Sequence, residues 1–242
     1  MTSDFSWLSR TELLIGQNAL QILANSHIMI VGLGGVGSFA AEFIARSGVG
    51  KMTIIDGDVI DNTNRNRQLP ALATNLGASK AVVMKQRLLE INPKLEIITV
   101  NQFINPEMVE DLLTTKPNFI IDAIDSITPK LTFMSMAYQQ GLQMVSSMGA
   151  GGKLDATQLK VVDISKTFNC PFAQQVRKNL NNKYGIKTGI KAVFSAEKTL
   201  KESLVLTDGT NFKKSAYGTI SYLPAVFGAV CASVVIRDLI KQ

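Results

Sequence analysis

The stretch HIMIVGLGGVGSFAAEFIAR, residues 27–46, decides the fold of this 242-residue chain. Residues 27–31 form a mostly apolar run typical of a buried strand, and Ser38–Arg46 places apolar side chains at helical spacing. Four glycines separate the two segments: Gly32, Gly34, Gly35 and Gly37. Glycines at such a junction permit a tight turn and let backbone N–H groups approach a phosphate at a helix N-terminus. The stretch therefore predicts the first strand, turn and helix of a nucleotide-binding sheet.

Strand-like and helix-like segments continue to alternate through the first 150 residues. Further strands are expected at Met52–Asp56, Leu95–Phe103, Phe119–Asp122 and Gln143–Ser147. Helices are expected at Ser79–Ile91 and from about Pro106 and Pro129 onward. A chain that alternates strand and helix in this way forms a mostly parallel sheet covered on both faces, so we expect a Rossmann-like α/β fold.

The pattern changes after residue 150. Short strands are expected at Leu159–Ile164 and Lys191–Ser195, around a helix at Pro171–Leu180, and the apolar segment Ile220–Ile236 predicts a closing helix. A polar stretch with a turn at Asp208-Gly209 is either a loop over the active site or an ordinary surface loop. We expect one domain over residues 1–242, with a nucleotide-binding core at 1–150 and a basic, substrate-binding extension at 151–242.

The composition excludes several classes of protein. Hydrophobic residues make up 46% of the chain, enough for a sizeable core. With two cysteines and one histidine, a four-cysteine zinc site, a disulfide framework and a histidine-based metal centre are not expected. The N-terminus lacks the pattern of a signal peptide, and Pro224 and Gly228 interrupt the most apolar segment, which is short for a membrane span. We therefore expect a cytoplasmic protein without a membrane association.

The charge is distributed unevenly along the chain. Residues 1–150 contain 11 Lys and Arg against 13 Asp and Glu, whereas residues 151–242 contain 14 against 6, which gives local charges of −2 and +8. A basic second half indicates either a polyanionic partner such as RNA or a lysine-rich solvated surface. Lys153 and Arg177 are candidate RNA contacts on the first interpretation.

Polar and charged residues gather where the expected strands end. Asp56 ends the second strand, where a carboxylate can accept hydrogen bonds from both hydroxyls of a ribose. The glycines and Asp56 alone favour NAD, or a nucleotide-binding scaffold, over ATP. Arg65, Arg67 and Lys80 change that balance, because adenylation needs cations around a triphosphate and hydride transfer does not. Asp122 and Asp125 offer carboxylates at which Mg²⁺ can bind.

These residues resemble the motifs of the ubiquitin-activating-enzyme-like superfamily in order and spacing. The matching elements are Gly32–Ser38, Asp56-x-Asp58, Asn64-x-x-Arg67-Gln68, Lys80 and Asp122-x-x-Asp125 followed by Ser126. The resemblance implies that the glycine loop and Asp56 hold ATP, and that Asn64, Arg67 and Lys80 contact its phosphates. It also implies that Asp125 organises Mg²⁺ and the attacking carboxylate. Arg10 resembles the arginine that members insert into the ATP site of a neighbouring subunit, which implies a homodimer.

Within that superfamily the chain most resembles the tRNA threonylcarbamoyladenosine dehydratases. Four stretches carry the likeness: Arg10–Gly16, Asp122–Ser126, Gly149–Asp155 and Val193–Glu197. The resemblance implies that ATP activates the side-chain carboxylate of a modified adenosine next to the tRNA anticodon, and that the adjacent carbamoyl group then closes a ring with loss of water. It makes a cysteine desulfurase or a sulfur acceptor conceivable as a partner.

Some alternatives remain open at this point. An adenylyltransferase that activates the C-terminus of a ubiquitin-like sulfur carrier is the second candidate, although such enzymes generally carry two CxxC pairs that bind zinc, and this chain has none. Cys170 is either a transfer thiol or a buried structural cysteine. Cys231 and His27 are expected to have structural roles.

Overall fold

The computed structural model describes residues 6–206 and 215–241. Within these residues seven strands form one sheet in the order β3-β2-β1-β4-β5-β7-β6. The strands of the sheet are β1 (His27–Val31), β2 (Lys51–Ile55), β3 (Glu96–Val100), β4 (Phe119–Asp122), β5 (Met144–Ser147), β6 (Leu159–Asp163) and β7 (Lys191–Ser195). All neighbouring pairs are parallel except β6 with β7. The expected α/β fold with a mostly parallel sheet is therefore confirmed.

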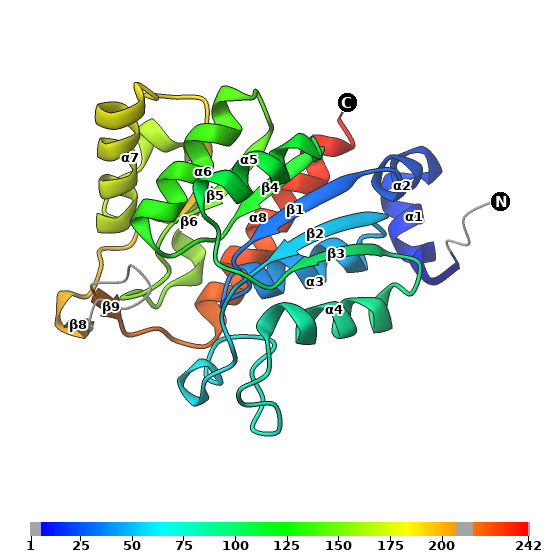
Figure 1. Ribbon diagram of the computed structural model, residues 1–242, viewed down its shortest axis with the longest axis horizontal. Helices are drawn as coiled ribbons and strands as arrows, with labels where there is room; N and C mark the ends of the chain where they lie inside the picture. The colour runs from blue at the N-terminus through cyan, green and yellow to red at the C-terminus, as the bar shows by residue number, and fades with distance from the viewer. Residues whose placement is uncertain (1–5, 207–214, 242) are drawn as a thin grey trace.

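Helices cover both faces of this sheet (Figure 1). They are α1 (Ser9–Ile15), α2 (Gln17–Ala24), α3 (Gly37–Arg46), α4 (Lys80–Ile91), α5 (Pro106–Thr114), α6 (Ile127–Gln139), α7 (Pro171–Tyr184) and α8 (Tyr222–Leu239). A separate hairpin pairs β8 (Leu204–Leu206) with β9 (Ser215–Tyr217). The turn expected at Asp208-Gly209 lies outside the described residues.

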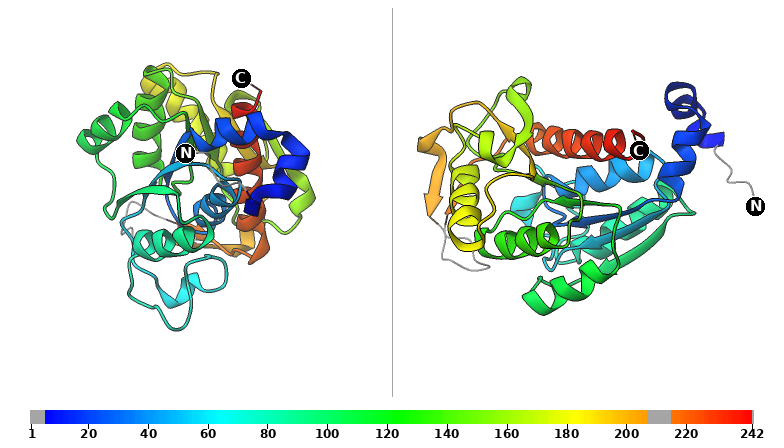
Figure 2. Two further views of the ribbon diagram at one scale, coloured as in Figure 1. Left: turned by 90° about the vertical axis from the view of Figure 1, so that its right-hand side faces the viewer. Right: turned by 90° about the horizontal axis from the view of Figure 1, so that it is seen from above.

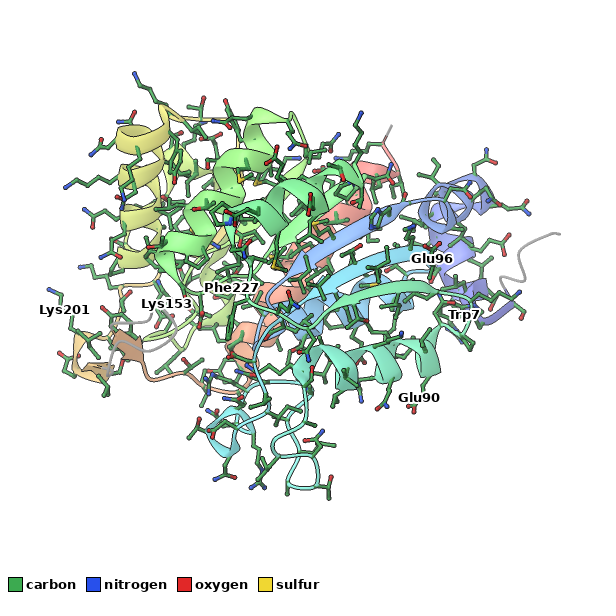
Figure 3. All side chains as sticks on the ribbon, in the orientation of Figure 1. Trp7, Glu90, Glu96, Lys153, Lys201 and Phe227 are labelled. Atoms are coloured by element: carbon green, nitrogen blue, oxygen red, sulfur yellow. The ribbon has the colours of Figure 1, made fainter. Side chains whose placement is uncertain are left out.

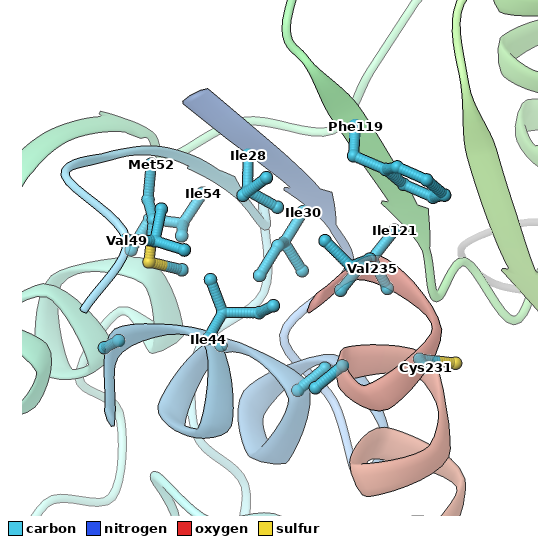
Figure 4. Close-up of a cluster of buried hydrophobic side chains, with 14 of the residues drawn as sticks. Ile28, Ile30, Ile44, Val49, Met52, Ile54, Phe119, Ile121, Cys231 and Val235 are labelled. Atoms are coloured by element: carbon cyan, nitrogen blue, oxygen red, sulfur yellow. The ribbon is translucent and has the colours of Figure 1, made fainter. Parts of the chain in front are cut away.

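Alternation along the central strand β1 explains the two layers of helices. Ile28 and Ile30 face α3, α4 and α8, whereas Met29 and Val31 face α5, α6 and α7. Because successive side chains of a strand point to opposite faces, a strand buried on both sides must be apolar throughout. The right-hand view of Figure 2 shows α8 and α5 on opposite sides of the sheet. Figure 4 shows the buried cluster that lies between the strands and helices α3 and α8.

The closing helix α8 packs closely against α3. A Cβ atom at Gly228 would lie 2.5 Å from the backbone oxygen of Val36, so only glycine permits this approach. Pro224 falls in the first turn of α8, where its missing N–H costs little. Among the described residues α8 alone is long and apolar enough to cross a membrane, and here it lies in the core, where burial raises the pKa of Cys231 to about 12.

Several elements differ from expectation in extent or kind. Strand β3 ends at Val100 and not at Phe103 as expected, because Gln102 and Phe103 turn toward a cavity. Helices α1 and α2 and the β8–β9 hairpin have no counterpart in the sequence analysis. A stripe of buried apolar residues could not have predicted helix α1, because none of its residues is buried.

Candidate functional site

A cavity of about 610 Å³ opens at the carboxyl edge of the sheet. Its walls come from the loops that follow β1, β2, β3, β4 and β5, together with the start of α7 and the end of the β8–β9 hairpin. In open α/β sheets, ligands bind in the crevice outside the carboxyl ends of the strands. The fold therefore places the cavity where a nucleotide site is expected.

The glycine loop forms one wall of this cavity. Gly32, Gly34 and Gly35 line it, and Gly32 has a φ of +88°, a left-handed conformation that favours glycine. Gly37 does not line the cavity, because it lies in the first turn of α3 with its Cα against the backbone of Gly32. A Cβ atom there would meet the Gly32 oxygen at 1.7 Å. Gly37 thus allows the loop to close, whereas the other three present their backbone to a ligand.

Asp56 follows β2 and is anchored to the glycine loop. Its Oδ2 accepts a hydrogen bond of 2.6 Å from the Leu33 N–H, and its Oδ1 accepts one of 2.8 Å from the Asp58 N–H. Burial raises the pKa of Asp56, although the charge of Lys80 and the two N–H groups oppose that effect. Each oxygen keeps lone-pair capacity, so the carboxylate can accept further hydrogen bonds from hydroxyl groups in the cavity.

Two of the three expected cations line the cavity. Lys80 is buried at the start of α4, and its Nζ lies 2.9 Å from Oδ2 of Asp58. The guanidinium of Arg67 donates to the Thr63 carbonyl at 2.8 Å and lines both the cavity and a shallower depression beside it. Arg65 lines only that depression. At the glycine-loop end of the cavity, the positive charge therefore comes from Lys80 and Arg67.

Asn64 and Gln68 complete this wall between the two cations. Asn64 is buried, and its Oδ1 accepts the Asp61 N–H at 3.1 Å, which closes a capping box on a short 3₁₀ helix, Asn62–Asn64. Among the described residues, Gln68 Oε1 is one of two buried side-chain oxygens without a hydrogen-bond partner. A buried acceptor without a hydrogen bond destabilises the fold. Such an acceptor in the cavity wall suits a side chain that receives a hydrogen bond from a donor of the bound ligand.

Asp122 does not offer a carboxylate to the cavity, contrary to expectation. It is fully buried, and its Oδ2 lies 2.7 Å from Nζ of Lys130 and accepts a hydrogen bond of 2.6 Å from the Ser146 hydroxyl. Lys130 Nζ also donates to the carbonyls of Ile124 and Ser147. Removing one partner of such a buried pair typically costs about 3–5 kcal/mol. Asp122 and Lys130 therefore tie together the loops after β4 and β5.

Lys130 is absent from the site predicted from sequence, because a lysine inside an otherwise apolar helix normally indicates exposure. It lies four residues after Ser126, the N-cap of α6, so the first turn of the helix brings it to the strand ends, a proximity that the sequence alone does not specify.

Asp125 and Ser126 line the cavity from the loop after β4. The Ser126 hydroxyl donates to Oδ1 of Asp125 at 3.4 Å, and Asp125 is exposed. Among the described residues there is no cluster of three His, Cys, Asp or Glu side chains that could hold a metal alone. A Mg²⁺ ion typically uses one or two carboxylates together with substrate phosphates, so a single carboxylate at this position fits a nucleotide-bound ion.

The far end of the cavity is walled by the Gly149–Asp155 loop, which a reciprocal clamp holds to the end of β7. Lys153 Nζ donates to the carbonyls of Ser195 at 3.0 Å and Glu197 at 2.7 Å. In return, the Glu197 carboxylate accepts the N–H groups of Leu154 and Asp155. Burial lowers the pKa of Lys153, and the charge of Glu197 opposes that effect. Lys153 is therefore not the surface RNA contact considered from sequence, because its side chain is buried in this clamp.

Three other residues considered from sequence lie as follows. Cys170 is buried at the N-cap of α7, where its sulfur accepts the Ala173 N–H at 3.5 Å, and it also lines the cavity. Arg177 donates to the carbonyl and hydroxyl of Thr167 and is only partly exposed. Arg10 is exposed on α1, at the end of the molecule where the strands begin, and does not line the cavity (Figure 1).

The chain is similar to a group of known proteins over nearly its whole length. The model of the ThiF family matches residues 8–242. The tRNA threonylcarbamoyladenosine dehydratase of Bacillus subtilis is 40% identical over 241 residues, which covers 97% of this chain and 94% of that protein. The crystal structure of the Escherichia coli dehydratase in complex with ATP has a TM-score of 0.90 and 34% identity, covering 100% of this chain and 96% of that one. A second structure of that enzyme, in complex with AMP, has the same TM-score.

Proposed function

Because the chain belongs to the ThiF family, we propose that it catalyses the ATP-dependent dehydration of threonylcarbamoyladenosine in tRNA. The observation that carries the proposal is the cavity, in which the glycine loop, Asp56, Arg67, Lys80 and Asp125 surround one space. This space continues to the Gly149–Asp155 loop, so it can take a nucleotide at one end and a second substrate at the other. The likeness to dehydratases over the whole length supports this substrate over a carrier protein.

The residues at the glycine-loop end of the cavity bind and orient ATP. Asp56 accepts hydrogen bonds from the ribose hydroxyls, and the N–H groups of the glycine loop approach the phosphates. Arg67 and Lys80 hold the triphosphate, while Asn64 and Gln68 fix the segment between them. With cations set in a partly buried wall, charge that develops at the α-phosphate is stabilised without reorganisation of solvent.

The reaction then proceeds in two steps that conserve atoms. A carboxylate oxygen of the threonyl side chain attacks the α-phosphorus, the bond to the β-phosphate breaks, and pyrophosphate leaves with its electron pair. The carbamoyl group next attacks the acyl carbon, AMP departs with the carboxylate oxygen, and the nucleophile loses a proton. The net result is a ring and the loss of one water from the nucleoside. No cysteine nucleophile is needed, which agrees with the burial of Cys170.

Mg²⁺ belongs to the proposal through Asp125. When bound to the triphosphate, the ion supplies charge neutralisation at the phosphate oxygens. Asp125 would hold this ion from the loop after β4, and the Lys130–Asp122 pair keeps that loop in place. Through the bound ion, Asp125 would also orient the incoming carboxylate.

We further propose a homodimer in which Arg10 reaches the ATP site of the other subunit. Support comes from α1, where Leu13 and Leu14 are 89% and 84% exposed beside Arg10. Large apolar side chains rarely gather on the surface of a monomer without a partner. In this arrangement residues 1–150 form the nucleotide-binding core, residues 151–242 form the substrate-binding extension, and the enzyme works in the cytoplasm with its tRNA. A desulfurase or sulfur acceptor would be an accessory partner.

The test uses tRNA that carries threonylcarbamoyladenosine, isolated from a strain without this enzyme. Incubation with the protein, ATP and Mg²⁺, followed by mass spectrometry of the nucleosides, should show conversion to a product that has lost one water. ATP–pyrophosphate exchange should require this tRNA. Exchange that appears only with a ubiquitin-like carrier protein would overturn the proposal in favour of the sulfur-carrier adenylyltransferase.

A further inference from the structure

Helix α7 has a composition unlike that of the other surface helices. Its 14 residues, PFAQQVRKNLNNKY, contain three cations and no Asp or Glu. Ala173, Val176 and Leu180 form its buried stripe. The exposed residues between positions 174 and 183 are Gln174, Gln175, Lys178, Asn181, Asn182 and Lys183, which we call the α7 face. It combines four amides with two positive charges, a combination suited to hydrogen bonding as well as to electrostatic attraction.

The neighbouring helix α5 has the opposite character. Both helices pack against α6 in the same layer, so their exposed sides belong to the same surface of the molecule. Helix α5 exposes Glu107, Glu110 and Asp111 and contains no Lys or Arg. A polyanion that approaches the cavity over this layer is therefore attracted to α7 and repelled from α5.

The α7 face begins at the substrate end of the cavity. Pro171, Phe172 and Gln175 line the cavity, and the helix then runs along the outer edge of the molecule for about 21 Å, at 1.5 Å per residue (Figure 1). Exposed Lys166 and Lys187 flank the two ends of the helix. Exposed Lys201 lies at the same end of the molecule as Lys153 of the cavity wall (Figure 3). Lys166, Lys178 and Lys187 thus place exposed positive charge at both ends and near the middle of α7.

We propose that the α7 face is the docking surface for the sugar–phosphate backbone of the tRNA arm whose modified nucleoside enters the cavity. This inference rests on the proposed function and adds the surface that holds the rest of the substrate. One nucleoside fills the far end of the cavity, so the flanking nucleotides must leave over the adjacent surface. Lysines neutralise phosphates, and amide side chains both donate to phosphate oxygens and bond ribose hydroxyls. An acidic protein has no row of ribose hydroxyls to which Asn and Gln side chains could bond. A surface rich in these amides therefore favours RNA over an acidic protein as the partner.

The test compares two double variants of equal charge. Lys178→Gln/Lys183→Gln removes charge from α7, and Lys85→Gln/Lys94→Gln removes the same charge from exposed positions on and after α4. Glutamine and lysine have similar helix propensities, so neither variant should disturb the fold. Binding of tRNA that carries threonylcarbamoyladenosine is measured by fluorescence anisotropy across a salt series, and turnover is measured with the same tRNA.

The α7 variant should bind this tRNA about tenfold more weakly, with a log–log salt slope smaller by roughly 1.8, the value for two lost phosphate contacts. Its KM for tRNA should rise while kcat at saturation and the KM for ATP stay unchanged, whereas the α4 variant should match the parent. Equal losses in both variants, or weakened binding of an acidic carrier protein and not of tRNA, would overturn the inference. Failure of the parent enzyme itself to bind or convert tRNA would instead reject the proposed function.

Discussion

At the scale of single residues, the two cations at the glycine-loop end of the cavity are held in different ways. Lys80 is buried and paired with Asp58, whereas the guanidinium of Arg67 donates to the Thr63 carbonyl and to the side chain of Asn66. A buried lysine has few alternative positions, so its charge is preorganised.

Replacing Lys80 by Ala should lower the rate of pyrophosphate exchange by about 10²-fold or more, since a charge-stabilising group is lost. Arg67→Ala should have an effect of similar size. Circular dichroism and urea denaturation should show folded proteins in both cases, because Asp58 is partly exposed and can be solvated after Lys80 is removed. Exchange at the parent rate in either variant would exclude that residue from the site.

His27 provides a prediction about pH. Burial and the nearby charge of Lys51 lower the pKa of this histidine, and Glu96 opposes them. The unfolded chain therefore takes up a proton near pH 6.5, before the folded protein does. The stability that neutral His27 contributes above pH 6.5 should therefore decline as the pH falls toward 5. Since His27 is the only histidine, urea denaturation at pH 7, 6 and 5 should show this slope, and His27→Gln should flatten it.

At the scale of elements, the reciprocal clamp between the Gly149–Asp155 loop and the end of β7 should control the substrate end of the cavity. Glu197→Ala removes the acceptor of two backbone N–H groups and so frees the loop. We expect kcat/KM for tRNA to fall about tenfold or more, with the calorimetric affinity for ATP retained. Glu202→Ala, an exposed carboxylate nearby, is the matched control. Parallel losses of ATP and tRNA binding in Glu197→Ala would contradict a role confined to the far wall.

The elements differ in how well local sequence predicts them. The glycine loop and β1 were predictable, because the turn requires glycine at Gly32 and a strand buried on both faces must be apolar. The roles of Asp122 and Lys130 were not, since their pairing depends on a return of α6 to the strand ends. The prediction that Lys153 is a surface RNA contact failed for the same reason. Its carbonyl acceptors, Ser195 and Glu197, come from a segment distant in sequence.

At the scale of the whole molecule, the position of α1 leads to a test of subunit exchange. Arg10 lies away from the cavity of its own chain, so a role in catalysis requires a second copy. Arg10→Ala should abolish turnover while the unfolding midpoint stays at the parent value. Mixed with Lys80→Ala, which keeps Arg10, it should regain part of the activity, because one site of each heterodimer is intact. Without recovery after verified subunit exchange, Arg10 does not act across the interface.

The close contact of α8 with α3 also has a consequence for biosynthesis. The glycine loop is backed by Pro224 and Gly228 of α8, which are synthesised long after β1 and α3. A nascent chain can form β1 and α3 early, yet the wall behind the loop is missing until α8 has been made. Chains truncated before α8 should thus form most of the sheet and no competent nucleotide site, which delays ATP capture until α8 has packed against α3.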